Sequence, residues 1–140
     1  DFAVQVRQGI REARANVKPG TPLSEVVVGW LFDLALENVD IFTVSLRELH
    51  GPAGPFRDVV RRLLASLAED MCEDLRQLPE LRTVEPSMLR GAVDLLIRNT
   101  AWLCLDYLEH PEQRQLLLDT AHEAFSSTIA GVIARSSQPK

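Results

Sequence analysis

Apolar residues recur at intervals of three and four positions along the whole chain, and no segment alternates steadily between apolar and polar residues. A repeat near 3.6 residues is typical of amphipathic helices, whereas strict alternation is typical of half-buried strands. Proline is tolerated in the first turn of a helix, because the N–H group that it lacks has no partner inside the helix. Four prolines therefore mark expected helix starts, at Pro22, Pro55, Pro86 and Pro111.

A further helix is expected to begin at Ile41, because the side chain of Asn38 or Asp40 can accept hydrogen bonds from its free N–H groups. The chain is thus predicted to be all-α, with six helices in a bundle-like arrangement. The expected helices span residues 1–16, 22–37, 41–50, 55–78, 86–109 and 111–135.

The last predicted helix, 111–135, carries apolar residues on more than one of its sides. A bundle of this size has few helices that could enclose a terminal one, so we expect a second copy of the chain to cover the remaining apolar surface. Together with the helix over 86–109, this helix is expected to form the four-helix interface of a homodimer. The candidate interface residues are Ala101, Leu105, Leu118, Ala121, Phe125 and Ile129.

Composition supports one compact domain, since 46% of the 140 residues are apolar and can form a core. The chain has 15 Lys and Arg residues against 20 Asp and Glu residues, which gives a net charge of −5. A domain that binds the phosphates of DNA needs a basic surface. We therefore expect that this chain alone does not bind DNA.

Two isolated cysteines, Cys72 and Cys104, fit a reduced protein better than a disulfide-bridged one, so a cytoplasmic location is expected. The longest stretch without a charged residue, 124–134, is much shorter than the roughly 20 apolar residues of a membrane span, so no membrane partner is expected. The chain begins with Asp1 and shows no basic-then-apolar leader. The sequence is accordingly expected to be a fragment or a trimmed product.

The sequence offers little support for catalysis, because it has no glycine-rich phosphate loop with a lysine and no Gly-x-Ser-x-Gly motif. Asp119 and His122 share one helical face, but a di-iron bundle needs two Glu-x-x-His units and two further glutamates. We expect no enzymatic activity, no catalytic residue, no metal and no cofactor. A small helical enzyme or metal-binding bundle built around these two residues is the alternative.

A cluster of acidic side chains lies in the second half of the helix predicted over 55–78. Runs of like charge on a helix are usually solvated faces, so we assign no site to this cluster. Its members are Glu69, Asp70, Glu73 and Asp74.

Large apolar side chains on several predicted helices are suited to the walls of a pocket for a small, mostly apolar molecule. The candidate wall residues are Trp30, Leu34, Phe42, Leu46, Leu64, Leu67, Met71 and Trp102. Polar side chains among them are candidate anchors for the ligand, namely His50, Arg98 and Asn99. Because Arg90, Asp94 and Arg98 are four residues apart, an ion-pair ladder on the surface is the competing interpretation.

The segment from Ile41 to Gly51, followed by Arg57 in a long helix, resembles the regulatory domain of TetR-family transcriptional repressors. The resemblance implies that residues 1–17 are the end of a linker helix from a DNA-binding headpiece that this chain lacks. It also implies that residues 18–135 form the ligand-binding and dimerisation domain, and that residues 136–140 are a flexible tail. In the parent protein, an N-terminal helix-turn-helix would contact DNA.

Two shorter motifs resemble the subgroup of this family that senses long-chain acyl-CoA and controls fatty-acid synthesis. They are Arg47-Glu48-x-x-Gly51 followed by Arg57, and Glu69-Asp70-x-x-x-Asp74-Leu75. The expected function is therefore that of a homodimeric, ligand-responsive regulatory domain whose effector is a long-chain acyl-CoA or a fatty acid. A helical adaptor without any ligand is the remaining alternative.

Overall fold

The computed structural model of the protein describes residues 2–50 and 55–137. These residues form helices and no strand, so the all-α prediction is confirmed for this part of the chain. The elements are α1 (Phe2–Ala15), α2 (Leu23–Glu37), α3 (Val39–His50), α4 (Pro55–Leu75), the 3-10 helix η1 (Pro79–Leu81), α5 (Pro86–Glu109), the 3-10 helix η2 (Pro111–Gln113) and α6 (Arg114–Ser136).

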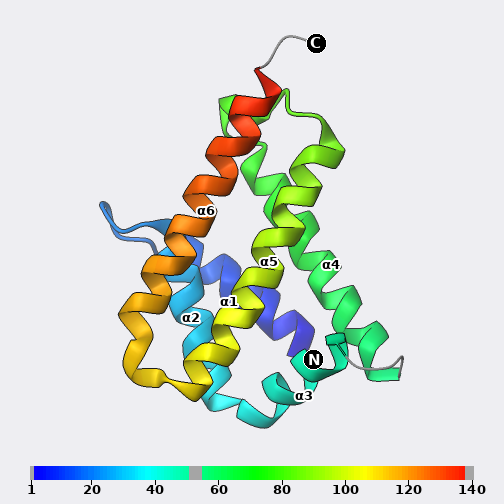
Figure 1. Cartoon of the computed structure of the whole chain (residues 1–140), viewed down its shortest axis with the longest axis vertical. Coiled ribbons are helices and arrows are strands. Elements are labelled where there is room, and N and C mark those ends of the chain that lie inside the picture. The colour runs from blue at the N-terminus through cyan, green and yellow to red at the C-terminus, as the bar shows by residue number, and fades with distance from the viewer. Residues whose placement is uncertain (1, 51–54, 138–140) are drawn as a thin grey trace.

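The helices α5 and α6 form an antiparallel pair that runs the length of the molecule (Figure 1). Helix α4 packs along α5, while α1, α2 and α3 gather toward the end at which α5 turns into α6 (Figure 1). Among the described residues, no helix is long and apolar enough to cross a membrane.

The predicted helix over 55–78 was too long, because α4 ends at Leu75. After this residue the chain turns and enters η1, which buries Leu81 completely. The apolar side chain of Leu78, which extended the sequence pattern, is instead exposed. The apolar repeat of the sequence therefore continues past the end of the helix, where the backbone turns back toward the core.

The proposed capping role of Asn38 was also wrong. Its side-chain Nδ2 donates to the carbonyl oxygen of Leu34, 2.9 Å away, and so satisfies a free carbonyl at the end of α2. Helix α3 begins directly afterwards at Val39, and Asp40 lies in its first turn. With one residue between the two helices, the side chain of Asn38 caps the helix that ends, while its backbone carbonyl accepts the first hydrogen bond of the helix that begins, from Phe42 N.

Two apolar clusters form the core. The first lies between α4, α5, α6 and the segment around η1; its buried members are Ala68, Leu75, Leu81, Val84, Leu89, Ala92, Val93, Leu96, Ile129 and Val132. The second lies between α2, α5 and α6; its buried members are Val28, Phe32, Leu103, Cys104, Tyr107, Leu117, Leu118 and Ala121. Because α5 and α6 contribute to both clusters, they are the common framework of the fold.

Arg114, the first residue of α6, joins three helices at the turn between α5 and α6. Its guanidinium donates to Asp33 Oδ1 at 2.8 Å, to the Tyr107 hydroxyl at 3.0 Å and to the Gly29 carbonyl at 3.2 Å. The Tyr107 ring stacks on Phe32 with 4.5 Å between the ring centroids, and Arg114 lies within cation–π distance of both rings. One side chain thus fixes the position of α6 relative to α2 and α5.

Replacing Arg114 with Met keeps most of the aliphatic stem and removes these hydrogen bonds. We expect the free energy of unfolding to fall by about 1–2 kcal/mol, because hydrogen bonds to a charged group are lost at a partly buried site. Urea denaturation measures this change. The matched control is Arg135→Met, whose guanidinium bonds, within the described part of the chain, only to the Gly131 carbonyl of its own helix. Equal losses in both variants would contradict the role of Arg114.

Candidate functional site

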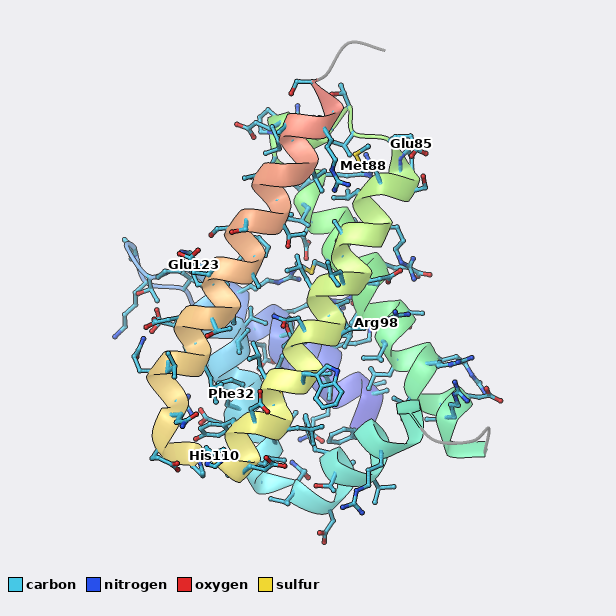
Figure 2. All side chains as sticks on the ribbon, in the orientation of Figure 1. Phe32, Glu85, Met88, Arg98, His110 and Glu123 are labelled. Carbon is cyan, nitrogen blue, oxygen red and sulfur yellow. The ribbon has the colours of Figure 1, made fainter. Side chains whose placement is uncertain are left out.

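An open cleft of about 480 Å³ lies between α4 and α5. Figure 2 shows Arg98 on the part of α5 that lies beside α4. The volume lies within the range of about 300–1,000 Å³ that is usual for small-molecule sites. The lining residues are Arg57, Arg61, Leu64 and Ala65 from α4, and Arg90, Asp94, Ile97, Arg98, Ala101, Trp102 and Leu105 from α5.

Helical spacing explains why these side chains share one cleft. On α4 the lining positions follow one another at steps of four, three and one, and on α5 they recur at steps of three, four and one. Such steps keep side chains on one face of an α-helix. Each helix therefore presents a single stripe. Because α4 and α5 run in opposite directions (Figure 1), the arginine end of the α4 stripe lies toward the apolar end of the α5 stripe.

The cleft is lined by charged and apolar side chains together. Four arginines and one aspartate occupy part of its lining, while the other side chains are aliphatic or aromatic. Arg90 Nε donates to Asp94 Oδ1 at 3.1 Å, so this pair forms the ion-pair ladder that the spacing suggested. All three residues line the cleft, and Arg98 does not join the ion pair. Ligand contact by Arg98 stays a prediction.

Three of the predicted pocket residues lie together in the cleft, namely Leu64, Arg98 and Trp102. The indole of Trp102 is 53% exposed, so it forms part of an open wall rather than of a closed pocket. Three observations point to the cleft as the candidate site: its volume, its mixed lining and this partial agreement with the sequence.

Most other predicted pocket residues lie elsewhere, and packing explains why. Trp30 covers Gly9 of α1 so closely that a Cβ at Gly9 would overlap its ring. Leu34 is buried, and Phe42 packs edge-to-face on Phe2 with 6.0 Å between the ring centroids. These side chains pack within the fold and do not line the cleft.

The remaining members of the predicted pocket divide into two groups. Met71 packs against the first core cluster, while Leu67 and Asn99 are partly buried and do not line the cleft. The side chains of Leu46 and His50 lie outside the described part of the structure.

Sequence reasoning missed several cleft residues, above all Arg57, Arg61 and Arg90. A signal was present, because Arg57 and Arg61 are four residues apart on one helix and Arg90 and Arg98 are eight apart on another. Only the packing of α4 beside α5 shows that these two pairs face one cleft.

The predicted interface residues are mostly occupied within the single chain. Leu118, Ala121 and Ile129 are less than 10% exposed, and Phe125 packs against the first core cluster. These four therefore offer little surface to a second copy, while Ala101 and Leu105 line the cleft. The buried apolar side chains of α6 pack against α2, α4 and α5, while Leu116 is exposed. The homodimer itself stays a prediction.

The acidic cluster on α4 is a solvated face only in part, because Glu69 and Glu73 are exposed whereas Asp70 and Asp74 contact α1. Asp70 accepts from Arg7 Nε at 2.9 Å and from Arg7 Nη2 at 3.0 Å, and Arg11 lies 3.6 Å away. Asp74 pairs with Arg14. Because three arginines of α1 neutralise two aspartates of α4, this cluster is a contact between helices that are distant in sequence.

The bidentate hydrogen bonds from Arg7 lower the pKa of the Asp70 carboxyl. A carboxyl whose pKa is lower in the folded state stabilises the fold while it is ionised. This contribution is present above its usual pKa near 4 and is lost as the pH falls through the lowered value.

The free energy of unfolding of the variant Asp70→Asn is therefore expected to be about 1 kcal/mol lower than that of the wild type at pH 7. A partly exposed ion pair contributes little more than that. The stability of the variant should also fall less steeply than that of the wild type below about pH 4. Thermal unfolding at several pH values measures both effects. The matched control is Asp58→Asn, an exposed carboxylate on the same helix. A similar pH response in both variants would argue against the ion pairs.

The alternative site around Asp119 and His122 is not assembled as a metal centre in the described residues. Ser24 Oγ lies 2.9 Å from His122 Nδ1, and Asp119 accepts from Gln115 at 2.9 Å. No group of three or more His, Cys, Asp or Glu side chains close enough to hold a metal occurs in this part of the chain. Both residues thus have structural partners.

The two cysteine thiols are both free and are poorly ionised. Burial raises the pKa of Cys104 to about 12 and also raises the pKa of Cys72. Thiolates are the reactive form of cysteine, so neither thiol is poised as a nucleophile near neutral pH.

Similarity to known proteins does not identify the chain. Comparisons with protein-family models, with curated proteins and with solved structures found no match. The functional assignment is therefore based on the cleft, on the helices that contact it and on the resemblance of the sequence motifs.

Proposed function

We propose that this chain is the ligand-responsive regulatory and dimerisation domain of a TetR-like transcriptional repressor in the cytoplasm. The cleft between α4 and α5 is the observation that carries the proposal. It combines apolar walls with a few charged groups, which is the usual composition of a small-molecule site. The proposed effector is mostly apolar, with a long-chain acyl-CoA or a fatty acid as the candidates.

The position of α4 supports mechanical coupling between the cleft and α1. Arg57, Arg61 and Leu64 line the cleft, whereas Asp70 and Asp74 bind the arginines of α1. At about 100° per residue, these two groups project from opposite sides of α4. A ligand that shifts α4 would therefore also shift the helix that the resemblance assigns to the linker.

Such a shift requires that the ligand binds one arrangement of α4 more tightly than another. In this proposal, α1 passes the difference to an N-terminal helix-turn-helix outside this chain. DNA contact belongs to that headpiece, which agrees with the net charge of −5 of the present chain.

Residues on the outer surface of α5 and α6 support the proposed homodimer. Leu95 on α5 and Leu116 on α6 are each 61% exposed. Gly91 is exposed, Gly131 is partly buried, and a Cβ added to either would have no neighbour within 4 Å. Leu95 and Gly91 are four residues apart on one face of α5, so this exposed apolar side chain beside a small residue allows another helix to approach closely.

Native mass spectrometry of the purified chain tests the proposal, because one spectrum reports both the number of subunits and any small molecule that remains bound. We expect a dimer that carries an additional mass of an acyl compound. A monomer without any bound molecule, under conditions that preserve other weak complexes, would contradict both the dimer and the sensor.

The dimer surface is tested by Leu95→Glu. In the single chain this exposed position tolerates a charge, but burial in a dimer would leave the carboxylate without a partner. Sedimentation velocity should therefore show a monomer for this variant. The control is Leu78→Glu, which places the same charge at a 46% exposed leucine outside α5 and α6, between α4 and η1, and should stay dimeric. A dimer in both variants would move the interface elsewhere.

A further inference from the structure

The arginines of the cleft between α4 and α5 are spread over both of its walls. On α4, Arg57 and Arg61 lie toward the apolar end of the α5 stripe, because the two helices are antiparallel (Figure 1). On α5, Arg98 and Arg90 lie toward the other end of the cleft, where the α4 stripe is apolar. An occupant that matches both walls therefore carries anionic groups on both sides of an apolar face.

The cleft is cationic although the protein as a whole is acidic. Four arginines and one aspartate line it, an excess of three positive charges in a chain of net charge −5. Arg90 is held by Asp94, whereas no hydrogen bond or ion pair joins the exposed side chains of Arg61 and Arg98 to another described residue. Charges of this kind attract a partner of opposite sign and orient it.

The apolar part of the cleft has the composition of a protein–protein interface. Trp102 is 53% exposed, and Leu64, Ile97 and Leu105 line the same cleft. Trp and Arg are among the residue types most enriched at the positions that dominate binding between proteins. A partner that covers the indole with its own apolar side chains would remove this surface from water. Trp102 is therefore suited to anchor a protein partner.

The secondary structure of the walls restricts the conformation of such a partner. Both walls are helices, whose backbone N–H and C=O groups bond within the helix itself. An extended peptide needs main-chain partners such as those of a strand edge, which neither helix offers. A helix satisfies its own backbone groups and can lay an apolar stripe into a groove. The lining of α5 from Arg90 to Leu105 extends for about 22 Å, which is about four helical turns.

We propose that the cleft is a docking groove for an acidic amphipathic helix of a partner protein. The apolar stripe of this helix packs on Trp102, while carboxylates on its two sides pair with Arg61 of α4 and Arg98 of α5. The inference goes beyond the proposed function, because it adds a protein partner that excludes the effector from the same cleft. Leu95, at the proposed dimer surface, does not line the cleft, so a second copy and the partner use different sides of α5.

Three synthetic peptides of about 16 residues, or four helical turns, test the inference by fluorescence anisotropy with the intact chain. The first carries leucines at intervals of three and four, with glutamates on both sides of this stripe and alanines elsewhere. The second replaces every glutamate with lysine, and the third keeps the composition of the first in an order that breaks the stripe. We expect the first peptide to bind at least about tenfold more tightly than the others, and more weakly at high salt concentration.

Variants of the protein test the assigned residues. Arg61→Glu and Arg98→Glu should each weaken the binding of the acidic peptide about tenfold, and the double variant should bind the lysine peptide instead. Trp102→Ala should weaken the acidic peptide as much without changing its salt dependence. The matched control Arg62→Glu reverses the same charge at the next residue of α4, which does not line the cleft, and should have little effect. Because all four side chains are exposed, the variants are expected to fold, and circular dichroism verifies this.

Several outcomes would overturn the inference. Equal binding of the acidic and the lysine peptide would contradict the charge complementarity, and equal binding of the acidic and the reordered peptide would contradict the amphipathic helix. Equal losses in Arg62→Glu and Arg98→Glu would move the contact away from the cleft. If sedimentation velocity shows self-association of the chain that Arg98→Glu abolishes, the occupant is a second copy rather than another protein. The proposed effector is tested separately, by native mass spectrometry of the chain without peptide.

Discussion

The hydrogen bonds of Arg114 set the geometry on which the other packing depends. The chain reverses direction between α5 and α6, and at this turn one guanidinium binds groups from α2 and α5. The stacked rings of Phe32 and Tyr107 lie beneath it. With this end fixed, α5 and α6 run antiparallel through both core clusters and leave one side of α5 for α4 (Figure 1). The position of the cleft is therefore a consequence of how the α5–α6 pair is anchored.

Helix α4 combines two kinds of interaction that are usually separated. One side of it contributes arginines and apolar side chains to the cleft, while the opposite side holds α1 through Asp70 and Asp74. Ion pairs at a partly exposed surface contribute little stability each, but they fix the relative position of two helices. Because charged contacts of this kind can break and re-form without disturbing the apolar core, they are suited to a contact that must change when a ligand binds.

The sequence predicted those residues of the candidate site that local spacing on one helix singles out. Arg98 and Trp102 stood out as a polar and an aromatic residue within an apolar helix, and both line the cleft. Trp30 and Phe42 stood out for the same reason, yet they pack between helices. A large aromatic side chain has the same helical spacing whether it faces a ligand or another helix, so spacing alone does not separate the two cases. The acidic cluster of α4 illustrates the same limit, since its partners are about 60 residues away in sequence.

By itself the sequence determined the helical class and the positions of the long helices, because both follow from local period and proline placement. Only the tertiary structure decided which apolar faces are covered within the chain, which arginines meet across a cleft and which carboxylates are neutralised. These properties depend on contacts between residues far apart along the chain. Such contacts depend on how whole helices pack, and the apolar repeat of one helix does not specify which other helix packs against it.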